Sequence, residues 1–362
     1  MSDWHVLVDR GDYRNVRVAS APPPELADGE ARLRVRSFGL TANNVTYAAA
    51  GDLIGYWTFF PAPDLGDGVA WGRVPVWGFA DVVETRCAGV VEGERLFGYL
   101  PMSTELVIRP ERVTDRTLVD GAPHRAALPV VYNQYVRCAA DPGYSPHGED
   151  AQMVYRPLFF TSFLIDDALD DEQLFGADTV VLASASSKTA FGTAFLLGQR
   201  PGVRVIGLTS DVNAGFVRSL GCYDQVYTYD EVAELPDGRV VFVDMSGDTR
   251  VVRRVHERYG DDLAHSMAVG ITHWEDRTTP TAPLPGPAPT MFFAPSRIEQ
   301  RRADWGPGGL EQRLAAAWAP FLGLVDGLVR IEHGEGPDAV VAVFGALVEN
   351  RASPDVAHVL HP

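Results

Sequence analysis

The first third of the chain alternates between apolar and polar residues. From residue 4 to about residue 113, the chain contains short apolar runs that are separated by Gly, Pro and Asp. Within this region apolar residues alternate with polar ones at a spacing of two. This alternation is typical of strands that bury one face, so it predicts a β-rich domain with closed or strongly bent sheets. The runs lie at 6–8, 31–35, 78–83, 94–99 and 105–108.

A different pattern begins at about residue 157. Residues 157–169 carry apolar side chains at helical spacing, and 179–183 form a continuous apolar run of the kind found in buried parallel strands. Strands that alternate with helices predict a doubly wound parallel sheet, and therefore an α/β fold. Further strands are expected at 203–208, 226–227, 240–244 and 266–270, and helices at 189–197, 212–220 and 249–259.

The remaining segments are expected to connect or flank these domains. The stretch 120–150 is rich in Pro, Gly and charge, and we interpret the region near 130–155 as an insertion. Residues 280–289 carry five prolines and are expected to form a loop or linker. Helical patterns follow at 310–328 and 337–350.

The turn after the first strand of the parallel sheet carries the most specific motif. It reads Ser-Ala-Ser-Ser-Lys-Thr-Ala over 184–190. In doubly wound sheets this turn presents free N–H groups of a helix N-terminus to a phosphate. Small residues replace the usual glycines, while hydroxyls and an ammonium add donors. We therefore predict a dinucleotide phosphate site formed by Ser184, Ser186, Ser187, Lys188 and Thr189.

Two rival motifs fail by spacing. A phosphate-binding loop of the Walker type would need glycine at the positions of Leu182 and Ser187, so phosphoryl transfer is disfavoured. A serine–lysine acyl-transfer site would need serine three residues before Lys188, where Ala185 stands.

Lys188 is the single lysine among the 31 basic residues; all the others are arginine. Its place in the turn is either chance or a sign that a compact ammonium is needed where a planar guanidinium would not fit.

Charge and composition exclude several classes of protein. The net charge of −17 is spread along the chain and repels polyanions, so nucleic acid is not an expected partner. No run of about 18 apolar residues is present, and the first residues lack a basic and apolar leader, so we expect a cytoplasmic protein without a membrane partner.

Several motifs resemble one known superfamily. Residues 38–44 (Phe-Gly-Leu-Thr-Ala-Asn-Asn) resemble the segment that contacts substrate and nicotinamide in quinone-reductase-like medium-chain dehydrogenases/reductases, and 77–83 and 93–98 resemble strands and turns of their first domain. Within the superfamily the chain is most similar to a bacterial branch described only as a domain of unknown function. That likeness rests on 156–164, 184–190 and 292–295.

The resemblance implies a fold and a reaction. The fold would be a GroES-like catalytic domain over 1–125 and 296–362 with a Rossmann-type domain over 126–295. The Cys and His spacing of a zinc site is absent from the sequence, so no metal is expected. Zinc-free members reduce an activated double bond, enone or quinone with a reduced nicotinamide, so a small carbonyl or quinone-like substrate is implied. Many relatives are homodimers, which nothing in this sequence decides.

Cofactor and catalytic residues follow from the same resemblance. The second strand ends without the acidic residue that would hold a ribose hydroxyl, and Ser210, Asn213 and Arg218 could meet a 2'-phosphate. NADPH is therefore favoured over NADH, although Asp211 opposes it. Phe293 is a further expected cofactor contact, and the expected catalytic residues are Asn43, Tyr47, Tyr132, Tyr135 and Lys188.

Other interpretations stay open. Any of these tyrosines could be an ordinary packed residue, and the aromatic segment 56–61 could line a cleft or simply pack. The fold could have lost its cofactor, leaving Lys188 to act as an amine in lyase or aldol-type chemistry. The protein could also bind a nucleotide without catalysis.

Overall fold

A computed structural model describes residues 3–20, 24–269 and 283–362. The chain forms two compact units, the first comprising 1–154 with 329–362 and the second comprising 155–328. The long helix α4 (Glu149–Asp171) begins in the first unit and continues in the second. Each unit is described by itself below.

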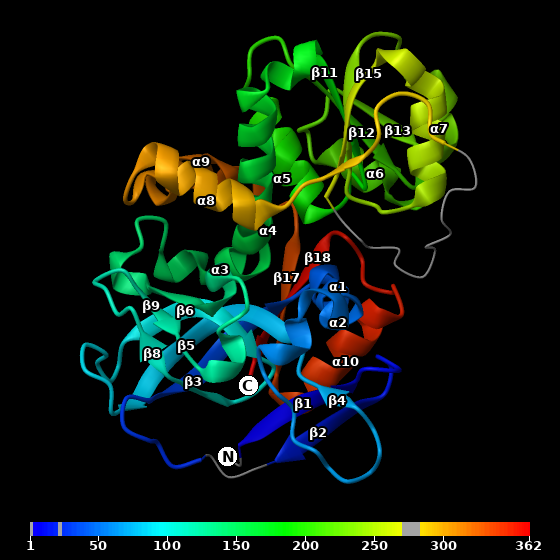
Figure 1. Cartoon of the computed structure of the whole chain (residues 1–362). Coiled ribbons are helices and arrows are strands. Elements are labelled where there is room, and N and C mark those ends of the chain that lie inside the picture. The colour runs from blue at the N-terminus through cyan, green and yellow to red at the C-terminus, as the bar shows by residue number, and fades with distance from the viewer. Residues whose placement is uncertain (1–2, 21–23, 270–282) are drawn as a thin grey trace. The chain divides into compact units, whose positions relative to one another are not determined.

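The first unit is built mainly from antiparallel strands, while β17 and β18 pair in parallel (Figure 1). One sheet has the order β2-β1-β4, and a nine-stranded sheet has the order β17-β18-β3-β5-β6-β10-β9-β8, with β7 also paired to β3. The strands are β1 (Trp4–Asp9), β2 (Val16–Ser20), β3 (Ala31–Leu40), β4 (Trp71–Gly72), β5 (Pro75–Thr85), β6 (Arg95–Pro101), β7 (Glu105–Ile108), β8 (Pro110–Glu111), β9 (Thr117–Asp120), β10 (Gln134–Arg137), β17 (Arg330–Glu335) and β18 (Val356–His361). The helices are α1 (Ala42–Ala49), α2 (Gly51–Ile54), α3 (Val130–Asn133) and α10 (Gly336–Val348).

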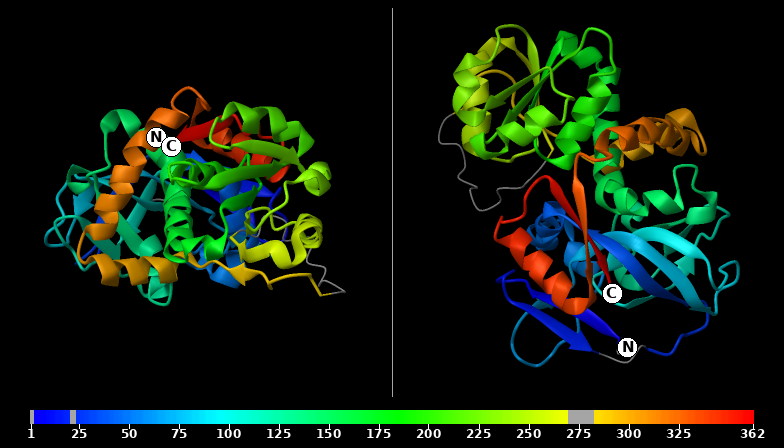
Figure 2. Two further views of the ribbon diagram at one scale, coloured as in Figure 1. Left: turned by 90° about the horizontal axis from the view of Figure 1, so that it is seen from above. Right: turned by 180° about the vertical axis from the view of Figure 1, so that it is seen from behind.

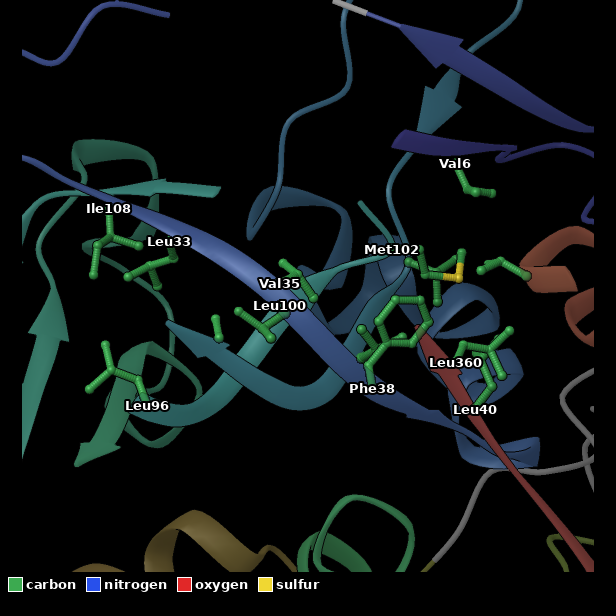
Figure 3. Close-up of a cluster of buried hydrophobic side chains, with 14 of the residues drawn as sticks. Val6, Leu33, Val35, Phe38, Leu40, Leu96, Leu100, Met102, Ile108 and Leu360 are labelled. Atoms are coloured by element: carbon green, nitrogen blue, oxygen red, sulfur yellow. The ribbon is translucent and has the colours of Figure 1, made fainter. Parts of the chain in front are cut away.

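The core of this unit lies between the inward faces of these strands (Figure 3). Val35 and Phe38 of β3 and Leu100 of β6 belong to this core and are almost completely buried. Helix α10 covers the cluster with Val340 and Phe344, which belong to the same core. The alternating apolar residues that predicted a β-rich domain are those that fill this core.

The region expected to be an insertion is part of the sheet. Strand β10 pairs with β6 and β9, with Val136 opposite Phe97 and Tyr135 opposite Leu118. Tyr135 is completely buried, and its ring fills the space beside Gly98. The strand reads Gln-Tyr-Val-Arg, in which two adjacent apolar residues lie between two polar ones, so no alternation indicated it.

The second unit contains one parallel sheet of six strands. Its order is β13-β12-β11-β14-β15-β16, which places the first strand in sequence next to the fourth. The strands are β11 (Thr179–Ala183), β12 (Arg204–Thr209), β13 (Gln225–Thr228), β14 (Val240–Asp244), β15 (Leu263–Ala268) and β16 (Thr290–Met291). This is the 3-2-1-4-5-6 order of doubly wound dinucleotide-binding sheets.

Helices cover both faces of this sheet (Figures 1 and 2). Val180 and Leu182 of β11 pack with α5 (Lys188–Leu197), while Val181 and Ala183 pack with α7 (Thr249–Tyr259) on the other face. Helix α6 (Asp211–Ser219) connects β12 to β13. Because β11 is covered on both faces, its sequence is continuously apolar.

Helices α8 (Ala294–Trp305) and α9 (Gly309–Val325) belong to the second unit, although residues 296–328 were expected in the first domain. Phe321 of α9 stacks on Phe159 of α4 with ring centroids 4.3 Å apart. Arg297 and Arg301 of α8 both pair with Asp167 of α4. An amphipathic pattern predicts a helix but does not say which surface it packs against.

The predicted fold class, a β-rich domain with a doubly wound parallel sheet, is confirmed. Strands β11 and β14 and helix α7 have their predicted bounds. Strand β15 begins at Leu263, earlier than predicted, and residue 270 of that prediction lies outside the described residues, as do 280–282 of the expected linker. Strands β17 and β18 were not predicted. Within the described ranges, no helix has the length and apolar character needed to cross a membrane.

A buried ion pair stabilises the first unit. Arg125 and Asp120 are each about 1% exposed at their side chains, and Nη1 of Arg125 lies 3.2 Å from the carboxylate. The Arg125 Nε donates to the Phe59 carbonyl at 3.0 Å, and the guanidinium lies 4.5 Å from the centre of the Phe60 ring. Arg125 therefore ties the 56–61 segment to the sheet.

We predict that Arg125→Met lowers the free energy of unfolding by about 3–5 kcal/mol, because it leaves a buried carboxylate without its partner. Urea denaturation would measure the loss. The matched control is Arg254→Met, which breaks an exposed pair with Asp230 and should cost less than about 1 kcal/mol. Equal effects of the two substitutions would contradict the proposed role of Arg125.

Candidate functional site

The turn between β11 and α5 is tight although it contains no glycine. Ser184 has φ of 56°, a left-handed conformation that non-glycine residues rarely adopt. The Ser187 N–H donates to the Ser184 carbonyl at 2.8 Å and closes the turn. Ser187 is also the N-cap of α5, since its hydroxyl accepts the Ala190 N–H at 3.3 Å.

Neighbouring side chains hold this turn in place. The Tyr223 hydroxyl donates to the Ala185 carbonyl at 2.8 Å, and the Asn213 amide donates to the Ser186 hydroxyl at 3.2 Å. The Ala185 N–H donates to the Leu208 carbonyl at 3.1 Å. A Cβ on Gly207 would come within 2.9 Å of the Tyr223 ring, so glycine is required there for Tyr223 to reach the turn.

This arrangement leaves backbone donors free. Among the described residues, the N–H groups of Ser186, Lys188 and Thr189 have no hydrogen-bond partner. They lie at the N-terminus of a ten-residue helix that has no acidic residue in its first turn. The helix dipole and the free N–H groups both favour an anion at this position.

Lys188 is the first residue of α5 and adds a positive charge to this helix end. Its Nζ lies 5.9 Å from the centre of the Tyr155 ring. No carboxylate forms a salt bridge with it in the part of the chain that the structure describes. The side chain is partly buried, and burial lowers the pKa of the Lys188 ammonium to about 8.

The second strand ends beside this turn. Ser210 is the N-cap of α6, and Asn213 in the first turn of that helix reaches back to Ser186. Arg218 is exposed; the Thr228 backbone N–H chiefly lowers the pKa of Glu231, and the Arg218 charge adds a smaller effect. Asp211 is also exposed, at the start of α6. Phe293 is 56% exposed at the start of α8.

The end of strand β14 lies at this sheet edge and was not among the predicted site residues. Strand β14 ends at Asp244, whose buried carboxylate accepts the Ser246 N–H at 2.9 Å and its hydroxyl at 2.6 Å. Burial raises the pKa of Asp244. Strands β11 and β14 are adjacent and parallel, and doubly wound sheets bind ligands beyond the carboxyl ends of such a pair. In the sequence, only the carboxylate at the end of the apolar 240–244 run pointed to this part of the edge.

In the first unit, the structure brings together Asn43, Tyr47 and Tyr132. Trp77 donates its indole N–H to the Tyr47 hydroxyl at 3.2 Å, and the Asn43 side chain is close enough to oppose the rise that burial causes in the pKa of this hydroxyl. The Tyr56 and Tyr132 hydroxyls lie 3.4 Å apart. Tyr99 completes the group, with its ring 5.1 Å from that of Tyr132 and 5.6 Å from that of Tyr47.

We call Tyr47, Tyr56, Tyr99 and Tyr132 the tyrosine cluster. Burial raises the pKa of all these hydroxyls, so they remain protonated donors at neutral pH. The Tyr99 hydroxyl is buried, and no described atom completes a hydrogen bond with it, although Tyr47 is near enough to affect its pKa. The tyrosine cluster therefore gathers protonated hydroxyls, each of which can donate one hydrogen bond.

Tyr135 has a different environment from the tyrosine cluster. Its hydroxyl donates to the Tyr99 carbonyl at 2.8 Å and lies 3.5 Å from Arg125. The residue is completely buried in the core, so these contacts give it a structural role. Tyr56, Trp77 and Tyr99 were not predicted as site residues; the aromatic segment 56–61 pointed to the first of them.

Solved structures with the same fold span the whole chain. CurA from Vibrio vulnificus in complex with NADPH is 15% identical over 99% of this chain and 98% of that chain, with a TM-score of 0.64. The mitochondrial 2-enoyl thioester reductase heterodimer from Candida tropicalis is 12% identical (TM-score 0.58), and the quinone oxidoreductase from Coxiella burnetii is 13% identical (TM-score 0.56). In both of these comparisons each chain is covered completely.

These likenesses show the fold, a GroES-like domain with a Rossmann domain as in medium-chain dehydrogenases/reductases. Residues 38–353 match the family described as "Protein of unknown function (DUF2855)". No curated protein matches the sequence. The described residues hold no group of three or more His, Cys, Asp or Glu side chains that could bind a metal ion.

The environment of Lys188 predicts an unusual titration. Reductive methylation with ¹³C-formaldehyde would label only Lys188 and the N-terminus, because the chain has no other lysine. The Lys188 signal should titrate near pH 8, since burial disfavours the ammonium. Lys188→Arg identifies the signal by removing it, and 8 M urea should return it to about 10.4. A native midpoint above 10 would show that Lys188 is solvated.

Proposed function

We propose that this chain, which belongs to the DUF2855 family of proteins of unknown function, is an NADPH-dependent, metal-independent reductase of an activated double bond, enone or quinone. One observation carries the proposal: free N–H groups and a lysine gather at the helix that follows the first strand of a 3-2-1-4-5-6 sheet. CurA, which has this fold, was solved with NADPH.

The residues of the turn fit a dinucleotide phosphate. The N–H groups of Ser186, Lys188 and Thr189 would donate to the phosphate oxygens, and the Lys188 ammonium would offset their charge. Ser184, Ser187 and the Tyr223 contact hold the turn in the shape that exposes these donors. Glycine is not needed when neighbouring side chains fix the backbone.

NADPH is proposed rather than NADH because of the end of the second strand. It carries Thr209 and Ser210 instead of a carboxylate that would select the unphosphorylated ribose. Ser210 and Arg218 would meet a 2'-phosphate, while Asn213 is already bonded to Ser186 and would mainly position the turn. Phe293 remains a proposed apolar contact for the cofactor.

The tyrosine cluster supplies the second half of the proposal. A bound reduced nicotinamide would provide the hydride. Tyr132 would donate a hydrogen bond to the carbonyl oxygen of the substrate and stabilise the negative charge that develops there. It is the partly exposed member of the cluster, and the Tyr56 hydroxyl lies within hydrogen-bond distance of its hydroxyl. Tyr47, whose hydroxyl accepts the Trp77 indole N–H, would be a second donor.

We expect NADPH to bind with an affinity that falls by about tenfold between pH 7.5 and 9.5. A phosphate beside Lys188 raises the pKa of its ammonium from about 8, so binding takes up a proton that becomes scarce at high pH. Fluorescence titration of NADPH at each pH measures the effect. Lys188→Met should bind more weakly and lose the pH dependence; wild-type protein that binds no NADPH would refute the proposal.

We also expect Tyr132→Phe to lower kcat on an enone or quinone by on the order of 100-fold with little change in KM, because it removes a donor to the developing oxyanion. Tyr135→Phe is the matched control: it removes a structural hydroxyl bond from the same unit and should change stability more than kcat. Binding of NADPH without turnover across enones and quinones would instead support a nucleotide-binding protein without catalysis.

A further inference from the structure

The hydroxyl of Tyr155 is a buried donor without a partner. The residue lies on α4 and is 2% exposed, and no atom in the part of the chain that the structure describes forms a hydrogen bond with its hydroxyl. Burial raises the pKa of this hydroxyl, so it keeps its proton at neutral pH. Leaving such a group unpaired costs stability, and most buried polar groups in proteins are paired. The unpaired hydroxyl therefore requires an explanation beyond packing.

Tyr155 lies beside the start of α5. The Nζ atom of Lys188 is 5.9 Å from the centre of its ring, and the ring of Phe191, one turn further along α5, is 6.1 Å away. The ring of Phe321 on α9 is 5.9 Å away. Two of these neighbours are apolar rings and the third is a cation, so none of them is an acceptor for the hydroxyl proton.

Close packing of α4 against α5 fixes this position (Figure 1). The Ser162 hydroxyl of α4 donates to the Thr189 carbonyl of α5 at 2.8 Å. A Cβ on Gly192 would come within 2.7 Å of the Ser162 Oγ, so the glycine permits the close approach. Tyr155 precedes Ser162 by seven residues, about two helical turns, and therefore lies on the same face of α4. The face of α4 that packs against α5 thus places Tyr155 at the first turn of α5.

The groups that meet at this helix end are donors. The N–H groups of Ser186, Lys188 and Thr189 are free, and the Lys188 ammonium has no carboxylate partner among the described residues. The first turn contains no acidic residue. The Tyr155 hydroxyl adds a further donor from a different helix. An anion with several oxygen atoms can accept from donors on both helices, and a diphosphate is such an anion.

We propose that the Tyr155 hydroxyl donates a hydrogen bond to a diphosphate bound at the start of α5, while the ring of the same residue holds the Lys188 ammonium beside it. The inference rests on the proposed function, in which this diphosphate is that of NADPH, and it adds a ligand contact from α4. The hydrogen bond that forms on binding offsets the cost of the unpaired hydroxyl in the free protein. Tyr155 thus lowers the stability of the free protein and strengthens the binding of the ligand.

Tyr155→Phe separates binding from stability, because it removes the hydroxyl and keeps the ring. We expect the affinities for NADPH and for inorganic pyrophosphate each to fall by about 10- to 100-fold, since both ligands lose a hydrogen bond to a charged oxygen. Calorimetric titration at pH 7.5 measures both affinities. The midpoint of thermal unfolding without ligand should stay the same or rise, because no hydrogen bond of the free protein is lost.

Tyr259→Phe is the matched control from the same unit. The Tyr259 hydroxyl donates to the Pro236 carbonyl at 3.2 Å, and the residue is 5% exposed. Removal of this hydroxyl should lower the midpoint of thermal unfolding by about 2–4 °C and leave both affinities unchanged. The two substitutions delete the same atom, but one is expected to change binding and the other stability.

Equal affinities of Tyr155→Phe and the wild type for both ligands would overturn the inference. A loss for NADPH alone would place the hydroxyl away from the diphosphate and would overturn it as well. A lower unfolding midpoint in Tyr155→Phe would reveal a structural hydrogen bond and contradict the unpaired state of the hydroxyl. Wild-type protein that binds pyrophosphate but not NADPH would remove the proposed reductase and leave the Tyr155 comparison valid, so the two proposals can fail separately.

Discussion

The backbone at the start of α5 is the constraint on which the candidate site depends. A phosphate turn must expose N–H groups, and this usually requires glycines, which the chain lacks here. Ser184 adopts the left-handed conformation that glycine would adopt, and contacts from Tyr223 and Asn213 hold the loop that follows. Gly207, on the next strand, makes room for the Tyr223 ring. The freedom of a flexible loop has thus been replaced by fixed side-chain contacts, which keep the donors oriented before any ligand arrives.

The candidate residues of the two units differ in charge: a positive helix end in the second unit and neutral hydroxyl groups in the first. In the second, positive potential gathers at a helix end that has no acidic residue in its first turn. In the first, the tyrosine cluster gathers neutral donors with few acceptors, while the nearby cation, Arg125, is occupied by Asp120 and the Phe59 carbonyl. Neutral hydroxyls stabilise charge only where it develops during a reaction, whereas a helix end attracts charge that a ligand already carries. The proposed reductase would use the helix end for its charged cofactor and the tyrosine cluster for its uncharged substrate.

The sequence predicted strands well where both faces of the strand are buried, and poorly where a strand is only partly buried. Strands β11 and β14 are apolar throughout because helices cover both faces, and their bounds were predicted correctly. Strand β17 lies at a sheet edge, and its second half consists of His333, Gly334 and Glu335. No apolar pattern therefore indicated a strand there. The serine-rich turn was recognised from its composition. Its free N–H groups were not, because they depend on the φ of Ser184 and on Tyr223, which is 38 residues away from Ala185 in sequence.

The uniqueness of Lys188 also makes the turn accessible to proteolysis experiments. A protease that cleaves only after lysine has one possible site in the whole chain, between Lys188 and Thr189. That bond lies inside the first turn of α5 and must unwind before it fits a protease active site. The appearance of the two fragments therefore counts openings of this helix end alone, against a background in which no other bond can be cut. The rate at which the fragments appear would therefore report the local unfolding of this single helical turn.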